Sequence, residues 1–122
     1  MKVLLSIKPE FAERIFEGTK GFEFRRTIFK NKNIQTIVVY ASSPVQKVIG
    51  EFEIEEILKD DLTKLWNKTK HKAGIDKSFF FKYFEGKEEG FAIKIKNAKR
   101  YQDALCLKKD FNAHPPQSFL YI

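Results

Sequence analysis

The residues that could do chemistry are gathered in one short stretch, which contains Gly18, Lys20, Glu23 and Arg25. Two phenylalanines alternate with the glutamate and the arginine. An extended chain would therefore bury both aromatic rings on one face and present both charged groups on the other. A turn built on Gly18 and Gly21 would hold Lys20 beside them. The stretch predicts a polar site at the start of a strand.

Each charged group allows a functional and a structural interpretation. Lys20 could bind a phosphate, or act as a nucleophile or base if burial lowered its pKa, but it could also be a turn lysine paired with Glu23. Glu23 could bind the edge of a nucleobase or transfer a proton, and its alternative is an ion pair with Arg25. Arg25 could bind a phosphate or stack on a base. The residue types alone leave these alternatives open.

The elements that must position this stretch are short. Alternating apolar residues predict a strand over residues 3–7, and Pro9 suits the first turn of the helix that follows. Gly18 ends that helix as a C-terminal cap. Further strands are expected over residues 22–28, 34–41 and 48–55, and the last of these has an acidic outer face.

The second half of the chain continues with helices and then strands. We expect two helices, one capped by Asp60 or Asp61 and one by Asp76 or Ser78. A strand with a basic outer face follows over residues 91–96, and the last five residues are predicted to form a closing strand. This order favours an α+β fold, a small β-barrel of five or six mainly antiparallel strands with two or three peripheral helices. Closure of the barrel would remove exposed sheet edges.

Composition favours a single domain spanning residues 1–122. The hydrophobic content of 43% includes thirteen phenylalanines, which supply a core and exclude wholesale disorder. No apolar run approaches the roughly 20 residues that cross a bilayer, and the N-terminal apolar stretch is too short for a signal peptide. We therefore expect a cytoplasmic protein with no membrane partner. His71, His114 and the single Cys106 do not complete a metal-ligand set, and no cofactor motif is present.

The net charge of +7 is concentrated in one segment. Residues 1–63 hold ten basic and ten acidic residues, whereas residues 64–100 hold eleven basic and four acidic ones. Such a surplus attracts phosphate backbones and would make binding sensitive to salt. Solvated lysines on helix surfaces explain the surplus equally well. The predicted phosphate patch consists of Lys64, Lys68, Lys70, Lys72, Lys94 and Lys96.

The pattern Gly-x-Lys-x-x-Glu-x-Arg, which residues 18–25 fit, resembles the signature of the ASCH family. Residues 6–9, 48–52, 90–95 and 115–119 also resemble strands of that family, so the likeness spans nearly the whole chain. The resemblance implies a PUA-like β-barrel with a cleft lined by the motif. It also implies that the partner is RNA or a nucleotide-like ligand, with DNA as a further possibility, in transcription or translation regulation.

Under this resemblance, we favour the interpretation that the motif residues line a ligand-binding cleft over the structural one. Tyr40 lies at the end of a predicted strand, near Ser42, and is the tyrosine best placed to line the cleft. We expect a binding module rather than an enzyme, and no cofactor. The expected ligand-binding or RNA-binding residues are Lys20, Glu23, Arg25, Ser6, Lys8, Arg26, Tyr40 and Ser42.

Other functions remain as hypotheses. Some small relatives within the family hydrolyse the acetyl amide of N4-acetylcytidine and resemble this chain at Lys20, which would then be the catalytic residue. Those relatives have a threonine where this chain has Glu23, and the difference weighs against that activity. Other relatives are linked to RNA cleavage, although no separate nuclease motif is present here. A protein-interaction surface could use the acidic strand face of Glu51, Glu53, Glu55 and Glu56.

Overall fold

A computed structural model describes residues 1–122 and shows one curled sheet of six strands. Only β1 and β3 run parallel, and every other neighbouring pair is antiparallel, which confirms the predicted mainly antiparallel α+β architecture. In spatial order the strands are β2 (Phe22–Arg25), β5 (Glu89–Leu105), β4 (Lys47–Asp61), β3 (Thr36–Ala41), β1 (Val3–Ile7) and β6 (Phe119–Tyr121).

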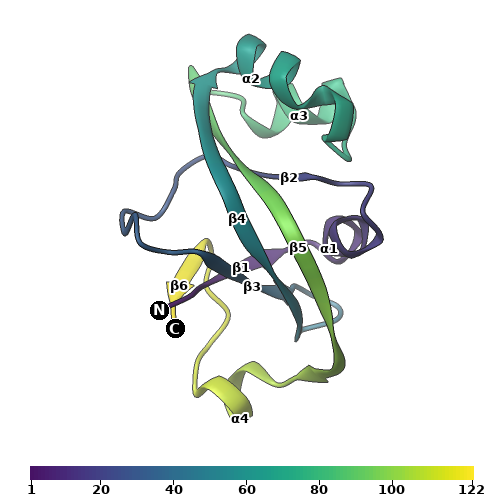
Figure 1. Ribbon diagram of the computed structural model, residues 1–122, viewed down its shortest axis with the longest axis vertical. Helices are drawn as coiled ribbons and strands as arrows, with labels where there is room; N and C mark the ends of the chain where they lie inside the picture. The colour runs from purple at the N-terminus through teal and green to yellow at the C-terminus, as the bar shows by residue number, and fades with distance from the viewer.

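Four α-helices and one 3-10 turn surround the sheet, and most of their predicted ends are confirmed. Helix α1 (Pro9–Glu17) ends at Gly18, whose φ of 87° is the left-handed cap conformation. Helices α2 (Leu62–Thr69) and α3 (Lys77–Tyr83) lie together at one end of the long β4–β5 ribbon (Figure 1). Asp61 caps α2 and Asp76 caps α3, each accepting a backbone N–H. The 3-10 turn η1 (Lys70–Lys72) connects them.

Helix α4 (Leu107–Phe111) was not predicted, so the chain has more helices than the two or three expected. A helix of five residues is too short to show a helical period. Its N-cap, Cys106, is not a usual capping residue and makes no side-chain capping bond, although Asn112 ends the helix in the common left-handed conformation. Figure 1 shows α4 at the opposite end of the β4–β5 ribbon from α2 and α3.

Strands β4 and β5 are much longer than predicted, at 15 and 17 residues. Their outer halves are charged, and that composition does not indicate a strand when each segment is read alone. In the folded chain the acidic face of β4 lies opposite the basic face of β5, with Glu53 paired in register with Lys96 and Glu51 with Lys99. Opposite charges across an antiparallel pair stabilise the strands. The length of the ribbon is therefore set by pairing between distant segments.

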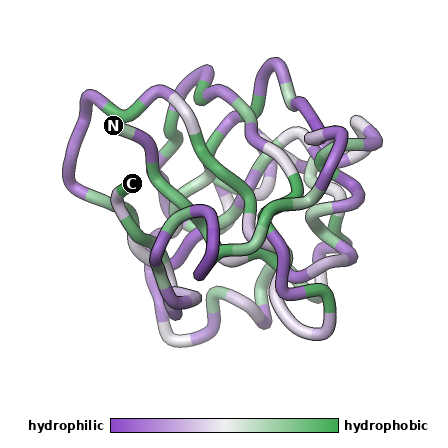
Figure 2. The backbone as a smooth tube through the Cα atoms, turned by 90° about the horizontal axis from the view of Figure 1, so that it is seen from below, coloured by the Kyte–Doolittle hydropathy of each residue, from purple (hydrophilic) through white to green (hydrophobic).

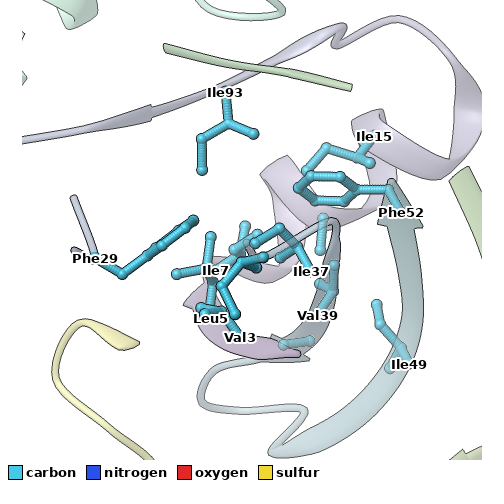
Figure 3. Close-up of a cluster of buried hydrophobic side chains, with 13 residues drawn as sticks. Val3, Leu5, Ile7, Ile15, Phe29, Ile37, Val39, Ile49, Phe52 and Ile93 are labelled. Atoms are coloured by element: carbon cyan, nitrogen blue, oxygen red, sulfur yellow. The ribbon is translucent and has the colours of Figure 1, made fainter. Parts of the chain in front are cut away.

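The main hydrophobic core lies between the inner face of β1, β3 and β4 and helix α1. Figure 2 shows hydrophobic stretches running through the middle of the molecule, with hydrophilic residues at the peripheral turns. The side chains that alternate inward along β1 and β3 meet one face of α1 through Ile15 (Figure 3). The strand contributors are Val3, Leu5, Ile7, Ile37, Val39, Ala41, Ile49, Phe52 and Ile93.

A second, aromatic cluster attaches α2 and α3 to the edge strand β2. Phe24 contacts Phe80 edge to face, with ring centroids 5.2 Å apart, and Phe22 and Phe84 belong to the same cluster. This packing buries the phenylalanine face of β2, as the alternation in the sequence predicted. Because the phenylalanines are held against the helices, Glu23 and Arg25 must point to the opposite side of β2.

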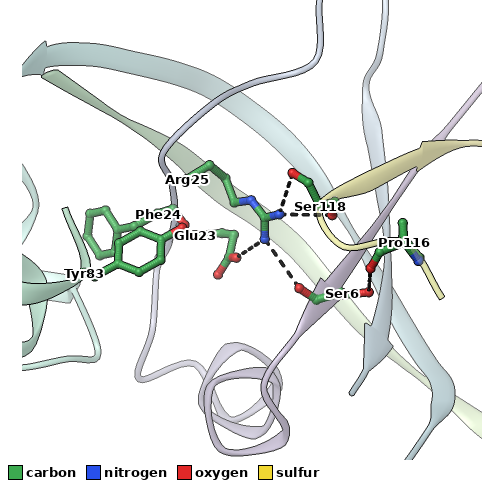
Figure 4. Close-up of polar contacts among 7 residues, drawn as sticks. All are labelled: Ser6, Glu23, Phe24, Arg25, Tyr83, Pro116 and Ser118. Atoms are coloured by element: carbon green, nitrogen blue, oxygen red, sulfur yellow. Dashed lines mark hydrogen bonds and ion pairs between the residues drawn. The ribbon is translucent and has the colours of Figure 1, made fainter. Parts of the chain in front are cut away.

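The curl of the sheet stops short of a closed barrel, and the Arg25 side chain bridges the gap. Strands β2 and β6 are the two edges of the sheet and do not pair with each other. The Arg25 guanidinium donates to the Ser118 backbone oxygen at 3.0 Å and to the Ser6 backbone oxygen at 3.4 Å (Figure 4). It also pairs with Glu23 at 3.2 Å. One side chain therefore connects β2 with β1 and with the residue preceding β6.

Replacing Arg25 with methionine should destabilise the fold strongly. The change removes these bonds and leaves the buried Glu23 carboxylate without its cation, and breaking a buried pair in this way costs about 3–5 kcal/mol. Urea unfolding measures the loss. Arg26→Met is the matched control, because Arg26 donates only to backbone oxygens, those of Tyr83 and Glu85. An equal loss in both variants would contradict a special role for Arg25.

Candidate functional site

The motif predicted from the sequence lines a cavity of about 230 Å³ between β2, the start of α1 and helix α3. Half of the lining residues are hydrophobic, and the remainder include four charged side chains. Such a mixture of apolar walls and a few polar groups is usual for a ligand site. The lining residues are Ser6, Ile7, Lys8, Phe11, Lys20, Glu23, Phe24, Arg25, Ile75, Phe79, Tyr83 and Gln117.

Lys20 is the most unusual group of the cavity because its amine is almost fully buried, with 3% of the residue exposed. Its Nζ donates to the Ala73 backbone oxygen at 3.0 Å and lies 4.7 Å from the centroid of the Phe24 ring. Burial lowers the pKa of Lys20 from 10.5 to about 8; the nearby Glu23 carboxylate raises it and the Arg14 guanidinium lowers it. The amine therefore loses its proton far more easily than an exposed lysine.

The segment after η1 holds Lys20 in this position. The Gly21 N–H donates to the Lys72 oxygen at 2.8 Å, and Arg14 donates to the Gly74 oxygen at 2.8 Å. Gly74 has a φ of +69°, and a Cβ there would lie 2.5 Å from the Cβ of Lys20. Only glycine allows this backbone to press so closely against the lysine side chain.

Glu23 has one carboxylate oxygen tied to the protein and one that is not. Its Oε2 accepts the bond from Arg25, whereas no protein group donates to Oε1 (Figure 4). The residue lines the cavity and is 6% exposed. The second oxygen is therefore an acceptor that a bound molecule could use.

Arg25 serves mainly to hold the site together. Both of its terminal nitrogens are engaged, with Glu23, Ser6 and Ser118. The ion pair that the sequence left open as an alternative is thus formed, and it orients Glu23 at the edge of the cavity. An arginine so engaged is not free to bind a phosphate with two parallel hydrogen bonds.

Ser6 and Lys8 line the same cavity as the motif residues. The Ser6 hydroxyl donates to the Pro116 oxygen at 2.8 Å, and the exposed Lys8 amine lies 5.8 Å from the Phe79 ring. The fold therefore gathers Ser6, Lys8, Lys20, Glu23 and Arg25 around one cavity.

Three predicted residues lie elsewhere. Tyr40 is 4% exposed and packs in a core cluster with Leu4 and Leu107, on the sheet face that the unpredicted α4 and the C-terminal tail cover. Ser42 directly follows β3, where its N–H donates to the Ile7 oxygen at the end of β1, and it does not line the cavity. Arg26 is bound to the backbone at the end of α3. The placement of Tyr40 in the cleft was wrong, because its side chain fills a core.

The aromatic wall of the cavity was not predicted from the sequence. Phe79 and Tyr83 reach it from α3, and Phe11 reaches it from α1. The Tyr83 hydroxyl donates to the Phe24 oxygen at 3.1 Å, and burial raises the pKa of Tyr83. Nothing in the local spacing of these residues distinguishes a cavity wall from a core stripe.

The six lysines of the predicted phosphate patch separate into two groups. Lys64, Lys68 and Lys70 lie on α2 and η1, where Lys68 pairs with Asp60 at 2.8 Å. Lys72, Lys94 and Lys96 line a second hollow beside the Gly18–Gly21 turn. No group of three or more His, Cys, Asp or Glu residues is placed to hold a metal ion, and no helix is long and apolar enough to span a membrane.

The lowered pKa of Lys20 predicts a distinct titration. Its Cε signal in NMR should shift with a midpoint near pH 8, well below the ordinary 10.5. Between these pH values the unfolded chain binds one more proton than the folded chain, so the free energy of unfolding should rise with pH. Glu23→Gln removes the carboxylate that favours the charged amine, and it should move the midpoint lower. A midpoint near 10.5 would show that the amine is solvated.

Comparisons with known proteins agree with this architecture. A family model described as a domain of unknown function, DUF365, matches residues 1–113. An ASCH domain-containing ribonuclease of Zymomonas mobilis is 32% identical over 124 residues, covering 99% of this chain and 84% of that protein. The crystal structure of ASCH from Zymomonas mobilis superposes with a TM-score of 0.90 at 32% identity, covering 99% of this chain and 87% of the other.

Other relatives contain a similar segment within longer proteins. The large ribosomal subunit protein uL22 of Ureaplasma parvum serovar 3 is 29% identical over 121 residues, which is 98% of this chain but 39% of that protein. The ATP synthase subunit alpha of the same organism is 29% identical over 122 residues, which is 15% of its length. With the match of the family model and the similarity to the Zymomonas protein along nearly the whole chain, the chain belongs to the DUF365 family and to the ASCH domain family.

Proposed function

We propose that this chain is an RNA-binding domain that takes one unpaired nucleotide into the cavity lined by the motif. The observation that carries the proposal is the meeting of the Lys20 amine and the free Glu23 oxygen inside a partly aromatic cavity of about 230 Å³. Proteins read single-stranded RNA by stacking splayed bases on aromatic rings and hydrogen-bonding to their edges. The name of the Zymomonas relative, a ribonuclease, supports RNA as the partner.

The groups of the cavity suit different parts of a nucleotide. Phe79 and Tyr83 provide apolar surface for a base, and the Glu23 oxygen accepts a hydrogen bond from its edge. Lys20 donates from the floor, and the exposed Lys8 supplies positive charge at the rim. Arg25 positions Glu23 without needing to touch the ligand.

The proteins that contain similar segments do not by themselves identify a partner. One Ureaplasma relative is named as a ribosomal protein and another as an ATP synthase subunit, and this chain matches a minor part of each. Similar segments therefore occur in proteins with unrelated names. For this reason the proposal is based on the cavity and not on these relatives. Any role in transcription or translation regulation would be a consequence of RNA binding.

A second candidate function is RNA cleavage, which the lowered pKa of Lys20 favours. At neutral pH about a tenth of an amine with a pKa near 8 is unprotonated, and that fraction can act as a general base. It would take the proton of a ribose 2′-hydroxyl, whose oxygen attacks the adjacent phosphorus. The P–O5′ bond breaks as a 2′,3′-cyclic phosphate forms, and the departing 5′-oxygen takes a proton from water. The name of the Zymomonas relative supports this reaction class.

Binding of fluorescent oligonucleotides tests the proposal. Single-stranded RNA should bind more tightly than duplex RNA or DNA, and Lys20→Met should weaken binding by about tenfold through loss of one charge-assisted hydrogen bond. Lys64→Met removes the same charge from an exposed position outside the cavity and should change affinity less than about twofold. Equal losses in both variants, or no RNA binding by the wild type, would overturn the proposal.

Turnover assays separate binding from catalysis. If Lys20 is a general base, cleavage of single-stranded RNA should rise with pH up to about 8 and disappear in Lys20→Met. Products are identified by chromatography, with N4-acetylcytidine as a parallel substrate for the amide-hydrolase hypothesis. If the RNA stays intact at high protein concentration, RNA cleavage is excluded and the binding function alone remains. Release of acetate from acetylcytidine would instead favour the hydrolase.

A further inference from the structure

A second hollow, of about 280 Å³, lies beside the Gly18–Gly21 turn and shares Lys20 with the cavity. We name it the basic hollow. Its lining includes Lys20, Lys72, Lys94 and Lys96, and it contains no Asp or Glu. The groove formed by residues 28–34 and 54–57 is different, because two glutamates balance its two lysines.

The fold builds this concentration of charge from three separate segments. Lys72 belongs to η1, whereas Lys94 and Lys96 alternate along β5 and so lie on one face of the strand. Residues of the Gly18–Gly21 turn also line the hollow. These segments are 50 or more residues apart from the turn in sequence, so only tertiary structure brings them together.

The lysines keep hydrogen-bonding capacity for a ligand. The Lys72 amine donates to the Gly18 oxygen at 2.6 Å, which fixes its direction and leaves two of its three protons. Lys94 pairs with Glu55 at 2.7 Å. Lys96 has no carboxylate within 4 Å and forms no side-chain hydrogen bond within the chain. The exposed His71 ring stands at the same hollow, edge to face with Phe22.

We infer that the basic hollow binds a backbone phosphate of the RNA strand whose nucleotide occupies the cavity, an inference that depends on the proposed RNA function. Lys20 lines both spaces, so the two sites adjoin through one side chain. A strand that places a base against Phe79 and Tyr83 can continue past the Gly18–Gly21 turn into the hollow. Phosphate contacts of this kind fix the register of a strand, while the cavity contacts its base.

This inference divides the predicted patch into residues that contact the strand and residues that do not. Lys72 and Lys96 should bind the strand directly, whereas Lys64 and Lys70 lie on α2 and η1 outside the hollow and contribute only a general attraction. A merely solvated lysine surface would make all four equivalent. The difference between the two pairs is therefore the measurable quantity.

The test compares Lys72→Ala/Lys96→Ala with Lys64→Ala/Lys70→Ala, two double variants that remove the same charge. Binding of a fluorescent single-stranded RNA is measured between about 50 and 200 mM salt. The first variant should bind about tenfold more weakly, and its plot of log affinity against log salt should be shallower by about 0.7 for each phosphate that the variant no longer neutralises. The second variant should remain close to the wild type.

Lys96→Gln serves as an independent variant, because Lys96 has no carboxylate within 4 Å and a neutral residue places no like charge opposite Glu53, its partner in register. It should also weaken RNA binding and flatten the salt dependence. Wild-type binding with equal losses in both double variants would overturn the inference and leave the proposed function intact. Absence of RNA binding by the wild type would overturn both.

Discussion

The arrangement of this molecule depends on the hydrogen bonds and the ion pair that the Arg25 guanidinium makes. A six-stranded sheet that curls without closing leaves two short edges, β2 and β6, with unpaired backbone groups between them. Arg25 donates across that gap to oxygens of Ser6 and Ser118, so a side chain does what a strand ladder would do in a closed barrel. The charge of the guanidinium needs a buried partner, and Glu23 provides it. The motif is therefore a structural bridge and a site at once.

The buried Lys20 shows how the site is linked to the packing of the helices. Desolvation disfavours its charged form, and the Glu23 carboxylate only partly offsets that effect. The amine remains in place because the Ala73 oxygen accepts its hydrogen bond and Gly74 lets the backbone approach. The aromatic cluster that docks α2 and α3 on β2 therefore also sets the environment of the amine. Chemistry at Lys20 and docking of these helices should not be separable.

The net charge of the chain is distributed by pairing as well as by sequence. Along the β4–β5 ribbon, lysines of β5 lie in register with glutamates of β4, and Lys94 forms an ion pair with Glu55. On the acidic face, Glu51 also accepts a hydrogen bond from Tyr101, so this face is engaged within the chain. Part of the remaining surplus, Lys72 and Lys96, lines the basic hollow beside the cavity.

By itself, the sequence determined the features that arise from neighbouring residues. The end of α1 at Gly18 and the alternation that buries Phe24 opposite Glu23 follow from local conformation and were predictable. The caps Asp61 and Asp76 were each predicted as one of two candidates. The motif itself also indicated the ASCH family.

Tertiary structure decided the rest of the fold and of the site, because these features depend on contacts between distant segments. The charged outer half of β4 becomes a strand only when it pairs with the start of β5, and the outer half of β5 only when it pairs with the start of β4. Tyr40 becomes a core residue only when Leu107 covers it. Phe79 becomes a cavity wall because α3 docks beside β2, and no periodicity within α3 encodes that. Sequence spacing therefore identified the polar centre of the site, while its aromatic walls and the basic hollow follow from the way three distant segments pack together.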